Sequence, residues 1–242
     1  MRRRLLVVRA GDSSLHPQWL PASGSRTFDL FVLAYGNYPE KYAETVEYFA
    51  HCSGLKFDVL HAFISGNYEL ITSYDYVGFP DDDIAAISTN WDQLFNIMEA
   101  YQIDIGQASL IHNGNVSRGI TGHVEGLILR WTDFVEVMMP VFSRRVLRTA
   151  WETFQHSGTG WGLDFAWQKL YPYTAFPTAI IDAVQVAHTR HSGKGDMYVA
   201  AARAHGLPLD QGAQVAKHHL AIIKKLYGLR NTQATREHGR VY

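Results

Sequence analysis

Three consecutive aspartates, Asp81 to Asp83, follow a short apolar stretch and Pro80. Adjacent carboxylates repel one another, so three together lower stability unless a cation compensates their charge. Carboxylate oxygens are the ligands that hard divalent cations prefer. Alternate residues of an extended turn point the same way, so Asp81 and Asp83 can face one metal ion. The alternative is that Asp83 caps the following helix and the other two are solvated.

A second acidic position, Asp164, follows the glycine-rich turn around Trp161 and begins an expected helix. Acids are favoured in a first helical turn by the helix dipole, which would make Asp164 a purely structural residue. Alternatively, the ring of Trp161 offers an apolar face to a sugar, and the neighbouring carboxylate takes a proton from a hydroxyl group. The residues alone leave both interpretations open.

His188 and Arg190 come directly after an apolar stretch that ends at Val186. A histidine just past a strand can ligate a metal ion, while Arg190 and Lys194 can bind phosphate. The alternative is a surface histidine flanked by solvated cations, because the chain has 12 histidines.

The elements that would position these residues alternate between strands and helices. Apolar stretches of strand length lie at Leu5–Arg9, Phe28–Ala34 and Tyr76–Phe79, and each is followed by turn residues. Helical spacing occurs between the second and third, at Glu40–Phe49 and Val59–Thr72. This alternation predicts an α/β fold, with a mostly parallel twisted sheet flanked by helices. Ligands of such sheets bind beyond the carboxyl ends of the strands, where the polar residues stand.

The rest of the chain continues this pattern up to its last quarter. Asn90 or Thr89 is expected to cap one helix, and Ser143 another. The pattern predicts strands at Ile103–Ser109 and Thr178–Val186, a loop at His112–His123, an extended stretch at Leu127–Phe142, and helices at Trp91–Tyr101, Val146–Phe154 and Leu163–Leu170. We therefore expect one domain over residues 1–192 and a helical C-terminal extension over residues 193–242.

The composition is that of a folded protein. Of the 242 residues, 47% are hydrophobic and 19% charged, which is enough to build a core and excludes a disordered chain. The net charge of −1 speaks against a globally basic nucleic-acid binder, so no nucleic-acid partner is expected. Cys52 is the single cysteine, which rules out an intrachain disulfide bond.

The N-terminal segment does not have the pattern of a secretion signal. Its apolar run is Leu5 to Val8, shorter than the roughly 7–15 residues of a signal peptide. No stretch reaches the roughly 18–20 apolar residues of a transmembrane helix. We expect a cytoplasmic protein, in which Arg2, Arg3 and Arg4 are solvated or make peripheral contact with an anionic membrane.

Six stretches of the sequence resemble one family, the domain of unknown function 707. These are VVRAGDSSLHPQWL, FDLFVLAYG, YDYVGFPDDDI, FVEVMMPVFSRRVL, GWGLDFAW and AIIDAVQVAHTR. They cover most of residues 5–190 in a single order. The family name implies no particular reaction.

The layout is also similar to the GT-A fold of nucleotide-sugar glycosyltransferases. This resemblance implies a DxD motif at Asp81–Asp83, completed by the late His188, that holds Mn²⁺ or Mg²⁺ against the donor diphosphate. It further implies that Asp164 is the acceptor base, in a Gly-Trp-Gly-x-Glu-Asp-like segment whose Glu is replaced here by Leu163. The remaining residues expected at the donor are Arg9, Asp12, Tyr35, Lys56, Asp82, Trp161 and Arg190.

The expected function is that of a metal-dependent, hexosyltransferase-like enzyme. It would move a sugar from a nucleotide diphosphosugar to a glycan or another hydroxyl acceptor, with Asp164 as base in an inverting enzyme or as a sugar-orienting residue in a retaining one. Because the second acid of the motif is missing, a non-catalytic nucleotide-sugar or carbohydrate-binding protein is the first alternative. A metal-dependent phosphohydrolase is the second.

Overall fold

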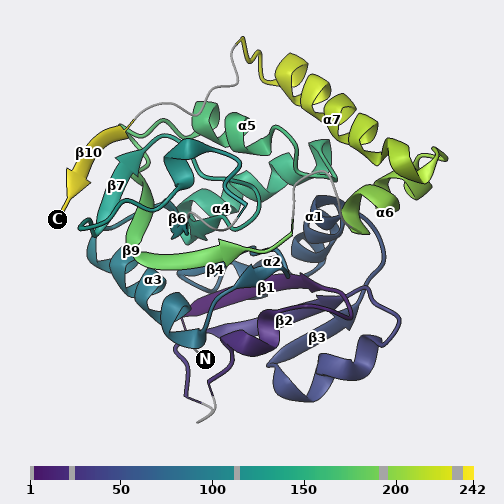
Figure 1. Cartoon of the computed structure of the whole chain (residues 1–242), viewed down its shortest axis with the longest axis horizontal. Coiled ribbons are helices and arrows are strands. Elements are labelled where there is room, and N and C mark those ends of the chain that lie inside the picture. The colour runs from purple at the N-terminus through teal and green to yellow at the C-terminus, as the bar shows by residue number, and fades with distance from the viewer. Residues whose placement is uncertain (1–2, 22–24, 112–114, 191–195, 231–236) are drawn as a thin grey trace.

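A mixed β-sheet runs through the centre of the computed structural model (Figure 1). The structure describes residues 3–21, 25–111, 115–190, 196–230 and 237–242. Within these ranges the strands are β1 (Arg4–Ala10), β2 (Asp29–Ala34), β3 (Tyr48–His51), β4 (Tyr76–Gly78), β5 (Ile84–Ala85), β6 (Ile105–Leu110), β7 (Leu129–Thr132), β8 (Val141–Ser143), β9 (Thr178–His188) and β10 (Glu237–Val241). Their order across the sheet is β10-β7-β9-β6-β8-β4-β1-β2-β3, and β5 pairs with β9 outside this path.

Most strands of this sheet point the same way. β1 pairs in parallel with β2 and β4, β2 with β3, and β6 with β9, whereas β7 and β8 run antiparallel to both of their neighbours. The carboxyl ends of β1, β2, β4 and β9 therefore open on one edge. This arrangement confirms the predicted α/β class and its mostly parallel sheet.

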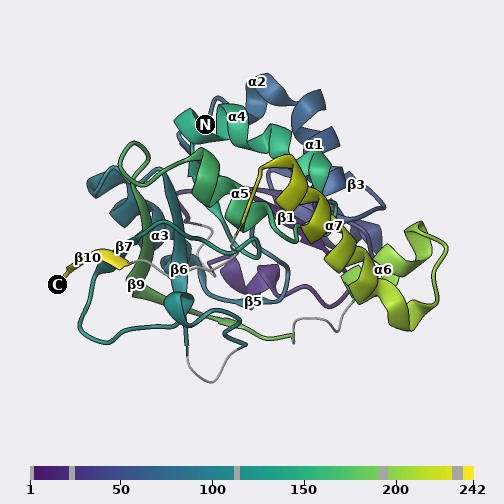
Figure 2. The same ribbon diagram turned by 90° about the horizontal axis from the view of Figure 1, so that it is seen from above.

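Helices cover both faces of the sheet (Figures 1 and 2). The α-helices are α1 (Lys56–Gly66), α2 (Tyr68–Ile71), α3 (Ser88–Ala100), α4 (Arg144–Ala150), α5 (Leu163–Leu170), α6 (Asp196–Ala204) and α7 (Gly212–Leu226). The 3₁₀ helices are η1 (His16–Trp19), η2 (Pro39–Thr45), η3 (Gly119–Thr121), η4 (Trp151–His156) and η5 (Leu209–Gln211). Alternate residues of β1 enter opposite cores: Leu6 and Val8 pack in the α3 core, and Leu5 and Val7 pack with α1, α4 and α5.

The helix predicted at Glu40–Phe49 is wrong. The chain forms η2 and then β3, whose residues from Tyr48 pair in parallel with β2 from Phe31 onward. The aromatic pair Tyr48-Phe49 favours a strand. Because β2 offers an open edge, pairing with it outweighs the local helical spacing.

The described elements of the C-terminal segment lie in two places far apart in the structure. Helices α6 and α7 lie together at one side of the molecule, and β10 lies at the opposite side (Figures 1 and 2). β10 pairs antiparallel with β7, so the end of the segment that was expected to be helical adds a strand to the sheet. The sequence did not predict β10, because its five residues, EHGRV, show no clear apolar alternation.

Among the described residues, none of the helices combines the length and the hydropathy needed to cross a bilayer.

Candidate functional site

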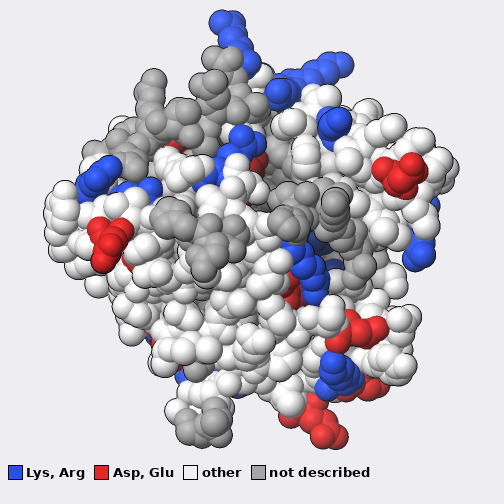
Figure 3. Space-filling model, viewed as in Figure 1, with Lys and Arg blue, Asp and Glu red and all other residues white. Residues whose placement is uncertain are grey.

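A cavity of about 910 Å³ opens at the edge where β1, β2, β4 and β9 end. In the space-filling view, basic and acidic side chains meet in a depression to the right of the centre of this face (Figure 3). Among the residues that line the cavity are all but one of the predicted site residues, namely Arg9, Asp12, Tyr35, Lys56, Asp81, Asp82, Asp83, Trp161, His188 and Arg190. The exception is Asp164. The fold thus gathers side chains from positions 9 to 190 into one site.

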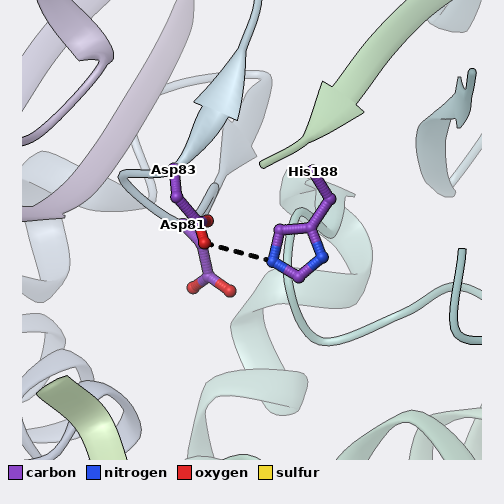
Figure 4. Close-up of side chains that lie close together, drawn as sticks. All are labelled: Asp81, Asp83 and His188. Carbon is purple, nitrogen blue, oxygen red and sulfur yellow. Dashed lines mark ion pairs between the residues drawn. The ribbon is translucent and has the colours of Figure 1, made fainter. Parts of the chain in front are cut away.

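Asp81, Asp83 and His188 form the acidic centre of this cavity (Figure 4). The two aspartates lie on the turn after β4, and His188 ends β9. Nε2 of His188 lies 3.3 Å from Oδ2 of Asp83. The two segments are held together because β5 pairs with the end of β9 and the amide of Thr189 donates to the carbonyl of Asp83 at 3.1 Å.

This cluster has the chemistry of a divalent cation site. One potential ligand atom from each residue lies within 4.8 Å of the others, close to the roughly 4.2 Å that two ligands on opposite sides of one Mg²⁺ reach. Oδ1 of Asp83 and Nδ1 of His188 are buried and have no hydrogen-bond partner among the described residues. Buried polar atoms are rarely left unpaired. These residues therefore fit a bound metal ion.

The charges of the cluster perturb one another. Burial raises the pKa of Asp81, and the charge of Asp83 adds to this, while Lys56 opposes it. Burial alone would lower the pKa of His188, but its hydrogen bond to Asp83 and the nearby negative charges outweigh burial and raise it. A bound divalent cation would favour the charged carboxylates and the neutral imidazole instead.

Lys56 stands at the first residue of α1 and binds the protein itself. Its ammonium donates to Oδ1 of Asp81 at 2.6 Å, to the carbonyl of Phe79 at 2.9 Å and to the carbonyl of Val137 at 3.1 Å. An ammonium has three N–H donors, so all of them have partners. The structure thus shows Lys56 holding Asp81, and the predicted contact of Lys56 with a phosphate stays a prediction.

Asp82 is not part of the candidate metal cluster, and its carboxylate ties three segments together. Its Oδ2 accepts from the amide of Gly11 at 2.8 Å and from the hydroxyl of Tyr35 at 3.3 Å. Its Oδ1 accepts from Arg190 at 2.9 Å, and Arg190 also donates to Ser13. The middle aspartate therefore joins the loops after β1, β2 and β9 around the cavity.

Arg9 and Asp12 line the same side of the cavity. The guanidinium of Arg9 lies 5.0 Å from the centre of the Tyr35 ring and donates to the carbonyls of Cys52 and Gly54. The carboxylate of Asp12 accepts from the amides of Asn37 and Tyr38, which holds its pKa below the usual value. These contacts orient the loops in which a nucleoside was expected.

Trp161 lines the same cavity together with the helix α6. Its indole Nε1 donates to the hydroxyl of Tyr198 at 3.2 Å, and both residues line the cavity. Arg203, further along α6, lines it as well. The sequence alone did not identify these two α6 residues, because nothing near them marks a site.

Asp164 lies in the first turn of α5 and lines a different, small pocket with Asp133, Val135 and Thr178. Burial raises its pKa to about 7, and the negative charge of Glu136 adds to the effect. Asp164 is absent from the residues that line the main cavity. Its role as acceptor base therefore stays a prediction that the cavity does not support.

Glu136 is a cavity residue that sequence reasoning missed. It follows β7, is 8% exposed and accepts a hydrogen bond from Thr121 at 2.5 Å. Its signal was present in the stretch FVEVMMPVF, where it is the single charged residue of an apolar run. A lone carboxylate at such a position is rarely buried without a reason.

The comparisons with known proteins agree with this architecture. The family model described as Protein of unknown function (DUF707) matches residues 129–237. No curated protein matches the chain. Among solved structures, a glucosyl-3-phosphoglycerate synthase from Mycobacterium tuberculosis, in complex with Mn²⁺, UDP-glucose and phosphoglyceric acid, is similar with a TM-score of 0.53 and 14% identity. The alignment covers 96% of this chain and 82% of that one.

S. aureus TarS, residues 1–349 in complex with UDP, is similar with a TM-score of 0.50 and 11% identity over 93% of this chain and 72% of that one. The chain spans 46% of the longer TarS chain, with 10% identity and a TM-score of 0.48. Identities this low carry the fold and not the activity. The chain thus carries the predicted DUF707 match on a fold of the GT-A type. The match covers residues 129–237, so it includes the last three of the six stretches and part of the C-terminal segment, but not the first three stretches.

Proposed function

We propose that this protein is a metal-dependent glycosyltransferase that moves a sugar from a nucleotide diphosphosugar to a hydroxyl acceptor. The observation that carries the proposal is the cluster of Asp81, Asp83 and His188 in the wall of a cavity large enough for a nucleotide sugar. Its place beyond the carboxyl ends of the strands is where α/β folds bind their ligands. The complexes of the similar synthase with Mn²⁺ and UDP-glucose and of TarS with UDP support the same donor class.

In this proposal, Asp81, Asp83 and His188 hold Mn²⁺ or Mg²⁺. A bound ion would neutralise the negative charge that develops on the leaving diphosphate. Arg190 adds a second positive charge at the same edge and is fixed in direction by Asp82 and Ser13. The pair of Arg9 and Tyr35 offers a flat cationic and aromatic surface to the nucleoside.

Trp161, which lines the same cavity, presents a ring against which a sugar can pack. Tyr198 holds the indole of Trp161 through its hydroxyl, so α6 fixes one wall of the sugar site. In this proposal, a hydroxyl-bearing acceptor would enter the same cavity beside Trp161.

The test uses the full chain, Mn²⁺ and a panel of nucleotide diphosphosugars. We expect nucleoside diphosphates to stabilise the protein only when Mn²⁺ is present. At one hundred times the dissociation constant, binding adds about 2.7 kcal/mol, or a rise in melting temperature of roughly 5–10 °C. We also expect one donor to be hydrolysed slowly, with release of its nucleoside diphosphate.

The two alternatives give different results in the same experiment. A non-catalytic binding protein shows the Mn²⁺-dependent stabilisation and releases no nucleoside diphosphate from any donor. A phosphohydrolase releases phosphate from simple phosphate esters without a sugar nucleotide. Absence of any Mn²⁺-dependent nucleotide binding would contradict the proposed function.

A further inference from the structure

Glu136 is an acidic side chain of the cavity wall that neither the metal cluster nor the donor contacts use. It lies in the segment that joins β7 to β8, and it is 8% exposed. A carboxylate this buried is costly unless it is hydrogen-bonded or has a function. Its Oε1 accepts from the hydroxyl of Thr121 at 2.5 Å, which orients the carboxylate from behind.

The segment that carries Glu136 is fastened to the turn of the metal cluster. The amide of Asp81 donates to the carbonyl of Met138 at 2.7 Å, and the ammonium of Lys56 donates to the carbonyl of Val137 at 3.1 Å. The amide of Glu136 itself donates to Oε1 of the buried Gln107 at 2.5 Å. These bonds hold Glu136 close to the site where the charge of the donor would lie, and its carboxylate interacts electrostatically with His188.

Glu136 and Asp164 face different spaces. Val135 lines the small pocket together with Asp164, whereas the next residue, Glu136, lines the main cavity. Val137 and Met138, which follow Glu136, line the main cavity as well, so the part of this segment that faces the cavity begins at Glu136. A carboxylate must lie within hydrogen-bond reach of the proton that it takes, and a molecule bound in the main cavity can approach Glu136 because Glu136 lines that cavity.

We propose that Glu136 is the catalytic carboxylate of the transfer, acting as the base that deprotonates the acceptor. This inference rests on the proposed function and specifies its mechanism. The acceptor oxygen forms a bond to the anomeric carbon while its proton passes to Glu136. The bond between the anomeric carbon and the diphosphate oxygen breaks, and its electron pair leaves with the nucleoside diphosphate. A direct displacement of this kind inverts the configuration at the anomeric carbon.

The test compares the full chain with Glu136→Gln in donor turnover, with Mn²⁺ and with water as the acceptor. We expect the variant to lose roughly 10²–10⁴-fold in kcat, as is typical of a lost general base. Its KM for the donor and its Mn²⁺-dependent binding of the nucleoside diphosphate should stay within about threefold. The matched control is Glu125→Gln, which neutralises an exposed glutamate and should leave turnover unchanged.

A second variant covers the case in which Glu136→Gln does not fold. Glu136→Asp keeps the charge but withdraws the carboxylate by one methylene, and a misplacement of about 1 Å can cost on the order of 10²-fold in rate. We expect Glu136→Asp to lose at least tenfold in kcat with an unchanged donor KM, and the released sugar to have inverted configuration when observed by NMR.

Three outcomes would overturn the assignment. The first is a folded Glu136→Gln or Glu136→Asp with wild-type kcat. The second is loss of Mn²⁺-dependent nucleotide binding in Glu136→Gln to the same extent as in Asp83→Asn, which would make Glu136 a metal ligand. The third is a retained anomeric configuration. If the unmodified protein neither binds a nucleotide with Mn²⁺ nor turns over a donor, the proposed function itself fails, which is a distinct result.

Discussion

The ammonium of Lys56 lies 2.6 Å from Oδ1 of Asp81, at the point where α1 begins beside the turn after β4. The side chain of Lys56 is 11% exposed and that of Asp81 33% exposed. The pair therefore joins a largely buried cation to a carboxylate that still reaches the cavity. Lys56 thus neutralises one of three neighbouring acids, and Asp81 still offers a carboxylate oxygen to the candidate metal cluster.

Replacing this cation should cost stability. In Lys56→Met the carboxylate of Asp81 loses its partner, and the carbonyls of Phe79 and Val137 lose their donor. Breaking a buried pair costs about 3–5 kcal/mol, and the partial exposure of Asp81 reduces this to about 1–3 kcal/mol. Urea unfolding at neutral pH measures the change. Lys217→Met, at an exposed position of α7, should stay within about 0.5 kcal/mol of the original protein.

The proposed metal ligands should differ in their contributions. Asp83→Asn should abolish Mn²⁺-dependent binding of a nucleoside diphosphate, whereas His188→Ala should weaken it less, because a neutral ligand attracts the cation less strongly than a carboxylate. Calorimetry with and without Mn²⁺ measures both. Asp210→Asn, at an exposed acid far along the chain, serves as the control. Unchanged affinity in Asp83→Asn would rule out this metal site.

Asp164 should make stability depend on pH. Burial raises its pKa in the folded protein from 3.8 to about 7, so the folded state binds more protons between these values. The contribution of Asp164 to the free energy of unfolding is fully present below pH 4 and is lost as the pH rises through 7. The original protein should therefore lose about 2–3 kcal/mol of its free energy of unfolding between pH 5 and pH 8, and Asp164→Asn should not show this loss. Urea unfolding at both values checks this, and a difference that does not change with pH would contradict it.

Gly160 should tolerate no side chain. Its φ is +82°, and a Cβ there would lie 2.4 Å from Cε2 of Phe57, a ring with 1% exposure in the core. Gly126 has nearly the same φ, +81°, with nothing within 4 Å of a Cβ. Gly126→Ala therefore measures the backbone strain alone, on the order of 1 kcal/mol. We expect Gly160→Ala to cost at least about 2 kcal/mol more, because the clash adds to that strain. Equal melting temperatures of the two variants would contradict this, because they would show that the Phe57 ring moves to make room for the new Cβ.

The sequence by itself predicted the α/β class, the strands β1, β2 and β4 that end at the cavity, and the three residues of the candidate metal cluster. Apolar runs of strand length before Gly11 and Asp81 are local signals, because a buried parallel strand must be apolar on both faces. A run of three carboxylates is equally local, since its repulsion is present in any conformation of the turn. Ten of the predicted site residues line one cavity because the carboxyl ends of parallel strands meet at one edge.

The tertiary structure alone decided which carboxylate enters the cavity. Asp164 stands in a recognisable motif, yet it lines another pocket, and Glu136 lines the cavity from a stretch that reads as an ordinary buried run. Likewise, β3 forms where the spacing predicted a helix, and α6 contributes Tyr198 to the site from more than a hundred residues after the aspartates. The physical reason is the same in each case. Which side of a segment faces a ligand depends on hydrogen bonds between segments distant in sequence, such as that of Asp81 with Met138, and local spacing does not encode these.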